Sequence, residues 1–195
     1  MDYPKKITKE EINELPMLKF EGEIILITNQ KSAIRAVNDL KKESVIGFDT
    51  ETRPSFKKGE TYDVSLLQLS NESTSYLFRL HKFDFPRELA DLMADEKIIK
   101  SGVAIRDDVI GLQKLHPFEE AGFFEIADEA KAQGYKNFGL RALTAIFLGK
   151  RLSKKAKITN WEQARLTPAQ LEYAALDAWV GLQIYHRING KSPQQ

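Results

Sequence analysis

Two acidic residues, Asp49 and Glu51, stand two positions apart at the end of an apolar run that begins at Val45. In a β-strand, residues two apart project to the same side, which places these carboxylates about 7 Å apart on one face. Carboxylates on a buried strand are unfavourable unless their charge is compensated, and a divalent cation compensates it directly. Taken alone, the pair is more typical of a strand that ends in a solvated acidic turn.

A second pair of acids, Asp107 and Asp108, lies in a segment whose apolar residues recur with a helical period. Asp108 is three residues from Ile105 and four from Leu112, inside the apolar stripe, whereas Asp107 points about 100° away. Asp108 is therefore predicted to face inward. The alternative is a surface aspartate on a helix of looser period, and whether Asp107 assists Asp108 stays open.

Near the C-terminus, Tyr173 and Asp177 are four residues apart and share one face of a predicted helix. Small residues surround them and would let this helix approach a sheet closely: Ala174, Ala175, Ala178 and Gly181. On its own, this spacing is also that of an ordinary hydrogen-bonded Tyr–Asp pair.

Together these positions offer four carboxylates, Asp49, Glu51, Asp108 and Asp177, with the phenol of Tyr173. The sequence has no Cys and 3 His, which excludes disulfides and cysteine–zinc sites and argues against a histidine-rich metal site. An all-oxygen set suits two Mg²⁺ or Mn²⁺ ions about 4 Å apart, the arrangement used for in-line displacement at phosphorus.

Three segments resemble, in order and spacing, the three exonuclease motifs of the DEDD superfamily: Phe48–Glu51, Gly102–Asp108 and Tyr173–Asp177. The Tyr-x-x-x-Asp spacing is similar to that of its tyrosine (DEDDy) branch, which includes ribonuclease D and the exonuclease domain of the Werner syndrome protein. Further similarity to the latter lies in Val64–Leu80 and Thr159–Tyr173.

The resemblance implies a ribonuclease H-like α/β fold, with a mixed sheet of five or six strands flanked by helices on both sides. It implies 3′-to-5′ hydrolysis of nucleic acid with release of nucleoside monophosphates. Asp49, Glu51 and Asp177 would hold the first ion, Asp49 and Asp108 the second, and Tyr173 would orient the nucleophile. DNA is the expected substrate. A ribonuclease D-like processor of RNA 3′ ends shares every catalytic residue, and an inactive nucleic-acid-binding module is the third alternative.

Contacts to single-stranded or 3′-ended nucleic acid are expected from two basic segments, because the acidic site itself repels phosphate. The candidates are Arg53, Lys57, Lys58, Lys150, Arg151, Lys154, Lys155 and Lys157. Each of them is equally typical of a solvated surface lysine or arginine. Trp161 is expected to anchor a loop under the last helix, and His116 and His186 to lie at the surface.

The 195 residues predict one domain over 1–190, with an N-terminal helical extension at 1–20 and a polar tail at 191–195. Roughly 18 consecutive apolar residues are needed for a membrane span, and no stretch approaches that length. A cytoplasmic location, no membrane contact and no obligate protein partner are therefore expected. The predicted strands are 23–28, 44–50, 64–69, 74–80, 97–101 and 123–127; the main predicted helices are 86–93, 103–115, 140–148 and 167–188.

Overall fold

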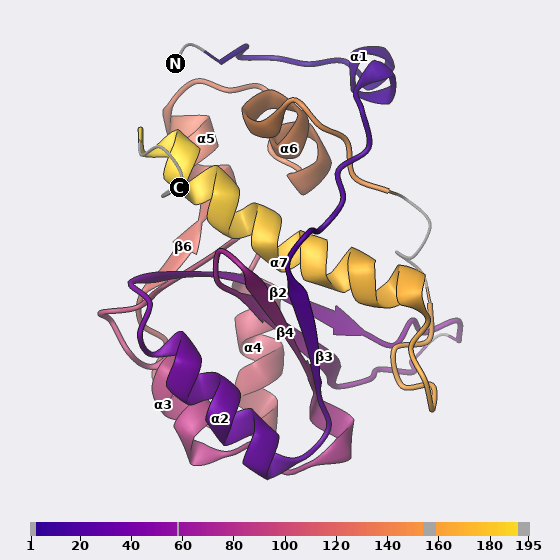
Figure 1. Cartoon of the computed structure of the whole chain (residues 1–195), viewed down its shortest axis with the longest axis vertical. Helices are drawn as coiled ribbons and strands as arrows, with labels where there is room; N and C mark the ends of the chain where they lie inside the picture. The colour runs from indigo at the N-terminus through magenta and orange to yellow at the C-terminus, as the bar shows by residue number, and fades with distance from the viewer. Residues whose placement is uncertain (1–2, 58, 154–158, 191–195) are drawn as a thin grey trace.

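A six-stranded mixed sheet forms the centre of the molecule, with helices on both of its faces (Figure 1). The computed structural model describes residues 3–57, 59–153 and 159–190. The strands, in the spatial order β1-β4-β3-β2-β5-β6, are β1 Glu23–Ile27, β4 Thr74–Arg79, β3 Val64–Ser70, β2 Val45–Thr52, β5 Ile99–Gly102 and β6 Phe123–Glu125. Strand β3 is antiparallel to both β2 and β4, while the pairs β1·β4, β2·β5 and β5·β6 are parallel.

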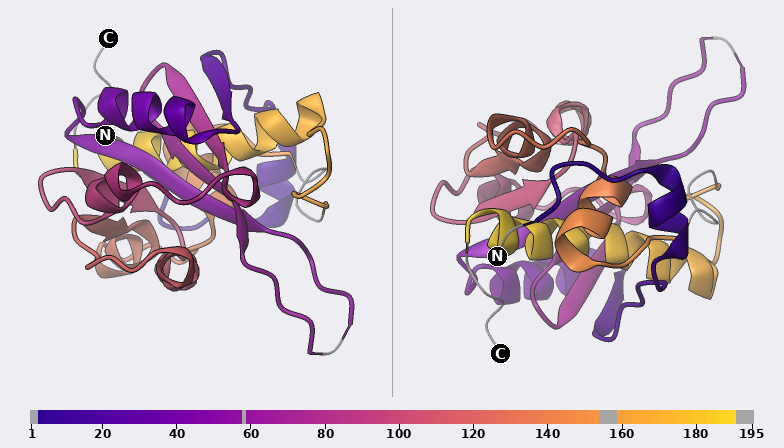
Figure 2. Two further views of the ribbon diagram at one scale, coloured as in Figure 1. Left: turned by 90° about the horizontal axis from the view of Figure 1, so that it is seen from below. Right: turned by 90° about the horizontal axis from the view of Figure 1, so that it is seen from above.

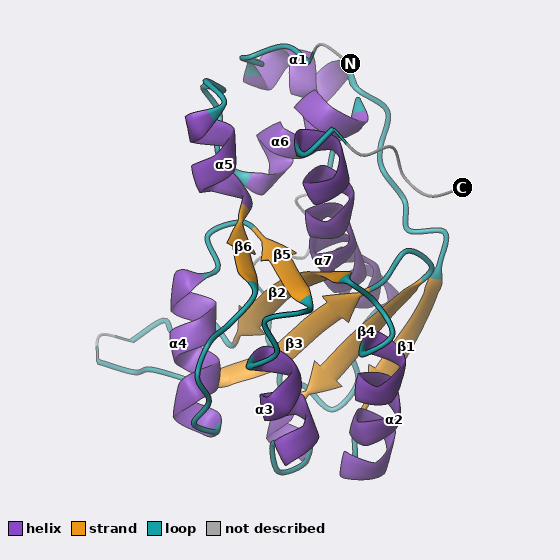
Figure 3. Cartoon of the chain, turned by 90° about the vertical axis from the view of Figure 1, so that its left-hand side faces the viewer, coloured by secondary structure: helices purple, strands orange, loops and turns teal. Residues whose placement is uncertain are grey.

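The helices divide between the two faces of the sheet (Figure 3). Their bounds are α1 Lys9–Glu14, α2 Gln30–Leu40, α3 Arg87–Met93, α4 Arg106–Leu115, α5 Ile126–Ala132, α6 Leu140–Leu148 and α7 Pro168–Ile188, with a 3₁₀ turn at Leu80–Lys82. Helices α2, α3 and α4 cover one face, and α7 crosses the other with α5 and α6 beyond it. The predicted α/β class, a mixed sheet with helices on both sides, is confirmed. In the part of the chain that the structure describes, no helix combines the length and apolarity that crossing a bilayer requires.

Strand β2 lies in the interior of the sheet, between β3 and β5, and its alternate residues face different layers. Ile46 and Phe48 join the apolar core under α2, α3 and α4. Gly47 faces α7 so closely that a Cβ atom there would overlap the backbone carbonyl of Ala178. This close approach holds α7 directly over the strand that carries Asp49.

Helix α7 is fixed at its two ends by different means. Thr167 and Gln170 form the predicted capping box at its start, with Pro168 in the first turn. Toward its end, Glu72 of the β3–β4 turn accepts a hydrogen bond from Gln183 Nε2 at 2.6 Å and pairs with His186 Nε2 at 3.0 Å. The expectation that His186 lies at the surface is wrong, since its side chain is 17% exposed and meets this carboxylate.

The segment after α4 departs from the predicted strand 123–127. Strand β6 ends at Glu125, and α5 begins directly after it because the Glu125 side chain accepts the backbone N–H of Ala127 at 2.9 Å as an N-cap. Helix α4 also starts later than predicted, at Arg106 instead of Val103. Ala104, just before it, adopts a left-handed conformation with φ 62° that interrupts the helical path.

Candidate active site and metal centre

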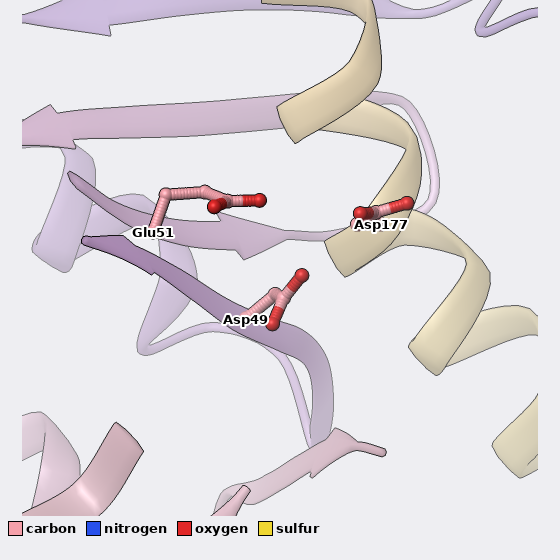
Figure 4. A group of neighbouring side chains, drawn as sticks. All are labelled: Asp49, Glu51 and Asp177. Atoms are coloured by element: carbon pink, nitrogen blue, oxygen red, sulfur yellow. The ribbon is translucent and has the colours of Figure 1, made fainter. Parts of the chain in front are cut away.

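Three carboxylates converge above strand β2 (Figure 4). Asp49 and Glu51 project from β2, and Asp177 reaches them from the overlying helix α7; one oxygen of each lies within 4.8 Å of the others. Asp177 is 7% exposed, and the other two are half-buried. The predicted convergence of two distant segments is therefore present in the fold.

The electrostatics of this group are those of an anionic site. Burial raises the pKa of Asp49 well above its usual range, and the charges of Asp177, Glu51 and Asp108 raise it further. A hydrogen bond with the Thr50 backbone acts in the opposite direction without compensating these effects. A hard divalent cation takes carboxylate oxygens as ligands and would relieve the repulsion, so the donor set fits such an ion.

Tyr173 lies one helical turn before Asp177, as the spacing predicts, and a side-chain hydrogen bond joins the two residues. Burial raises the pKa of the Tyr173 phenol above its ordinary value of 10, and the charges of Asp177, Glu51 and Asp49 raise it further. The phenol is therefore neutral at physiological pH and can serve as a hydrogen-bond donor. The buried Trp161 packs near it, with ring centroids 6.1 Å apart, which agrees with the expected anchoring role of Trp161.

Asp108 faces inward from α4, while its neighbour Asp107 is exposed. Its carboxylate accepts a hydrogen bond from the hydroxyl of Thr50, which lies between Asp49 and Glu51 on β2. Burial raises the pKa of Asp108 to about 6, against the lowering effect of the Thr50 bond. Asp108 is outside the three-oxygen group, but its charge is near enough to act on Asp49.

Glu125 holds the start of α4 in place, a role that sequence reasoning missed. Its two carboxylate oxygens accept the backbone N–H groups of Ala104 and Ile105, each at 2.9 Å. The same side chain also caps α5. It therefore links β6, the left-handed residue and the helix that carries Asp108. Glu125 stands in an acidic stretch of the sequence, where nothing in its own spacing distinguishes it from solvated glutamates.

The first basic segment lies on the loop 53–63, which projects away from the body of the protein (Figure 2). Arg53 pairs with Glu162 at 3.4 Å, and its guanidinium lies 4.6 Å from the centroid of the Tyr62 ring. Lys57 is well exposed, and Phe56 near it is 83% exposed. A pocket of about 390 Å³ lies at the base of this loop, lined by Arg53, Pro54, Phe56, Lys57, Glu60, Tyr62, Thr159 and Asn160.

The second basic segment is described in part. Lys150 is exposed, whereas Arg151 is half-buried and its Nε donates to the Leu15 carbonyl at 2.8 Å. Arg151 also forms a β-bridge with Met17, which binds the N-terminal segment to the loop after α6. The candidates Lys58, Lys154, Lys155 and Lys157 lie outside the described residues.

A second pocket, of about 250 Å³, adjoins Tyr173 and Asp177 and was not expected. Its lining is Met17, Leu18, Lys19, Leu152, Ser153, Ala169, Glu172, Tyr173, Leu176 and Asp177. The N-terminal extension therefore contributes a wall beside the candidate site. No local pattern could indicate this, because the bridge that fixes the N-terminal segment joins residues 134 positions apart in the chain.

A family model described as 3′-5′ exonuclease matches residues 24–192 of this sequence. The chain belongs to the 3′-5′ exonuclease family. Relatives include the mouse bifunctional 3′-5′ exonuclease/ATP-dependent helicase WRN, which is 33% identical over 186 residues that make up 90% of this chain and 13% of the mouse protein. An Arabidopsis thaliana 3′-5′ exonuclease is 29% identical, with 87% of this chain and 65% of that protein covered. The chain thus spans less than two thirds of the length of these relatives.

Solved structures show the same fold. The EXO domain of Aedes aegypti Nibbler superposes with a TM-score of 0.80 at 24% identity, covering 88% of this chain and 91% of that one. Escherichia coli RNase D superposes with a TM-score of 0.79 at 21% identity, covering 86% of this chain and 44% of that one. Divalent metals are generally used in the 3′-5′ exonuclease family, and the acidic cluster agrees with that use.

Proposed function

We propose that this chain is a metal-dependent 3′-5′ exonuclease that hydrolyses phosphodiester bonds from the 3′ end of DNA and releases nucleoside monophosphates. The observation that carries the proposal is the convergence of Asp49, Glu51 and Asp177, with oxygens within 4.8 Å of one another. Tyr173, one turn from Asp177 on α7, supports assignment to the tyrosine branch of the family.

The ligand set follows from the positions of the acids. Asp49, Glu51 and Asp177 would hold one Mg²⁺ or Mn²⁺ ion, and Asp49 together with Asp108 would hold a second. When bound, such ions lower the pKa of a coordinated water and stabilise the charge on the leaving 3′ oxygen. In this scheme, the hydrogen bond from Thr50 would hold the Asp108 carboxylate in one orientation.

Tyr173 supplies orientation in this scheme. Its phenol stays protonated at working pH, because burial and three carboxylates raise its pKa, and so it cannot accept a proton as a general base. Its single proton is donated to the Asp177 carboxylate, so its oxygen would accept a hydrogen bond from the attacking water and hold that water in line with the scissile bond. The hydrogen bond with Asp177 restricts the hydroxyl to the metal side of the helix.

Substrate contact would come from the projecting loop. Lys57 offers an exposed cation for the phosphate backbone, and Phe56 offers an exposed ring on which a base can stack. Arg53 lies at the base of the loop, where its pairing with Glu162 would position it for a phosphate. The residues within 154–158 that the sequence predicts to contact substrate lie outside the described residues.

RNA is the second candidate substrate. Two proteins of similar fold are named as ribonucleases, E. coli RNase D and a Trypanosoma brucei RNase D in complex with RNA. Both are under 25% identical to this chain, so their likeness bears on the fold alone. An inactive nucleic-acid-binding module is disfavoured, because such a module has no need of carboxylates whose burial is unfavourable.

The experiment compares DNA and RNA strands of matched sequence, labelled at the 3′ end and incubated with Mn²⁺. Release of deoxynucleoside monophosphate at the higher rate is expected. A higher rate on RNA would replace the DNA assignment with the ribonuclease one. Binding of either strand without release of mononucleotide would support the alternative of an inactive nucleic-acid-binding module. The Asp177→Ala variant is the control for a contaminating nuclease, because it should release nothing.

A further inference from the structure

The side chain of Gln68 on β3 is fully buried, and neither its Oε1 nor its Nε2 has a hydrogen-bond partner in the described part of the chain. A buried polar group without a partner destabilises the folded protein. The buried Ser70, on the same face of β3, is satisfied: its Oγ donates to the carbonyl of Asn71 at 3.1 Å. Among the described residues Arg79 and Arg141 each also leave a buried Nε without a partner, but Gln68 is the side chain with two such atoms.

The register of the sheet places Gln68 beside the acidic cluster. Strands β2 and β3 are antiparallel, and Gln68 stands directly opposite Asp49. Directly opposed residues project to the same face, with Cβ atoms about 4.5–5.5 Å apart. This is the face covered by α7, since Leu66, two residues earlier on β3, packs against Ala174 of that helix.

The carboxamide would supply Asp49 with a side-chain donor in addition to its hydrogen bond with the Thr50 backbone. It carries two N–H donors, whereas the neighbours Glu51 and Asp177 are acids that offer acceptors to a cation and repel the Asp49 carboxylate. A carboxylate that binds metal needs donors to its remaining lone pairs if its orientation is to be fixed. A methionine of similar length would fill the same space without an unsatisfied amide, so packing alone does not require glutamine.

We propose that Gln68 is a positioning residue for Asp49: its Nε2 donates to the Asp49 carboxylate when the site holds metal, and so fixes the angle at which that carboxylate meets the cations. This inference rests on the proposed metal-dependent function of the site. It accounts for the unsatisfied amide, because the cost is incurred in the metal-free protein and removed on loading.

The test is the Gln68→Met variant, with Gln68→Leu beside it in case one of them fails to fold. In EDTA, the melting temperature of Gln68→Met is expected to equal or exceed that of the wild type, because an unsatisfied amide has been removed. The Mn²⁺ concentration that gives the half-maximal rise in melting temperature is expected to increase about 10- to 100-fold. The value of kcat should fall by a similar factor, while KM for the nucleic-acid substrate changes less than about twofold.

Ser70→Ala is the matched control, since it removes a polar group from the same strand and leaves the metal response unchanged. Wild-type Mn²⁺ response and kcat in Gln68→Met would overturn the inference. A fall in the metal-free melting temperature of both variants, together with lost activity, would assign Gln68 a structural role and overturn it as well. If wild type released no nucleotide while Gln68→Met still weakened Mn²⁺ binding, the proposed function would fail and the positioning role would stand.

Discussion

At Asp49, burial and three neighbouring carboxylates act in one direction, and each disfavours the charged form of the side chain. The residues that prepare this site for a cation therefore weaken the protein when the cation is absent. The groups that serve function at this site lower the stability of the metal-free protein. Such a trade-off is common where charged groups are concentrated at a site. One substitution should change activity and stability in opposite directions, and both changes can be measured.

The Asp49→Asn variant should lose nuclease activity and gain stability in EDTA. Removing one negative charge relieves repulsion with Glu51 and Asp177, worth on the order of 1 kcal/mol, and the melting temperature should rise by about 2–4 °C. The stabilisation that Mn²⁺ gives the wild type should be lost. Differential scanning calorimetry with and without Mn²⁺ measures both effects. Glu119→Gln, an exposed acid elsewhere, serves as control, and a metal-free melting temperature at or below that of the wild type would contradict the prediction.

The two adjacent acids of α4 differ in how far they are buried. Asp108 faces inward and binds Thr50, whereas Asp107 is exposed. Asp108→Ala is therefore expected to lower kcat by about 100-fold or more, and Asp107→Ala to leave it within about twofold. The rates at which the two variants release nucleotide from a labelled nucleic-acid strand in Mn²⁺ test this expectation. Loss confined to Asp107→Ala would show that the other acid serves the site.

At the scale of elements, the β3–β4 turn governs how α7 lies on the sheet. Besides its contacts to Gln183 and His186, the backbone carbonyl of Glu72 accepts the Trp179 indole N–H at 3.0 Å. The turn therefore holds the half of α7 that follows Asp177. The hydrogen bond with His186, with smaller effects from Gln183, lowers the pKa of Glu72 below its usual range despite partial burial.

This lowered pKa makes a contribution to stability that depends on pH. A carboxyl whose pKa is depressed by folding stabilises the protein above its unfolded pKa of about 4.5, and the contribution is lost as pH falls through the folded value. Glu72→Gln should therefore reduce the free energy of unfolding at pH 7 by at most about 1 kcal/mol, since the group is partly exposed. The difference from wild type should vanish well below pH 4.5. Urea titrations at several pH values measure it, and a difference that grows in acid would contradict it.

Local patterns predicted most elements, because alternation, helical period and capping chemistry are properties of neighbouring residues. The capping box at Thr167 and the inward face of Asp108 are examples. The convergence of the acids was expected from the resemblance to the three exonuclease motifs, since it joins segments far apart in the chain. Helix α5 was missed because its start depends on the side chain of Glu125, which also binds the backbone before α4. The partial burial of His186 and the wall formed by Met17 depend on partners far away in sequence, and local patterns carry no trace of them.

At the scale of the whole molecule, charge is separated, although the formal net charge is only +1. An anionic centre lies between β2 and α7, and the loop 53–63 carries Lys57 and Phe56 outward from the body of the protein (Figure 2). A nucleic-acid strand bound by the loop would be delivered to the acidic residues, while the loop itself takes no part in the chemistry. Binding and turnover are therefore expected to respond to different substitutions.

The Phe56→Ala variant tests this separation. Loss of an exposed ring should cost little stability, because the side chain is 83% exposed and contributes little to the core. Stacking on an aromatic ring is worth about 1–3 kcal/mol per base, so KM for a single strand should rise about 5-fold or more while kcat stays within about twofold. Phe138→Ala, which removes another exposed phenylalanine outside the loop, is the matched control and should leave KM unchanged. An unchanged KM in Phe56→Ala, or an equal rise in Phe138→Ala, would remove the loop from the binding surface and leave the metal centre as proposed.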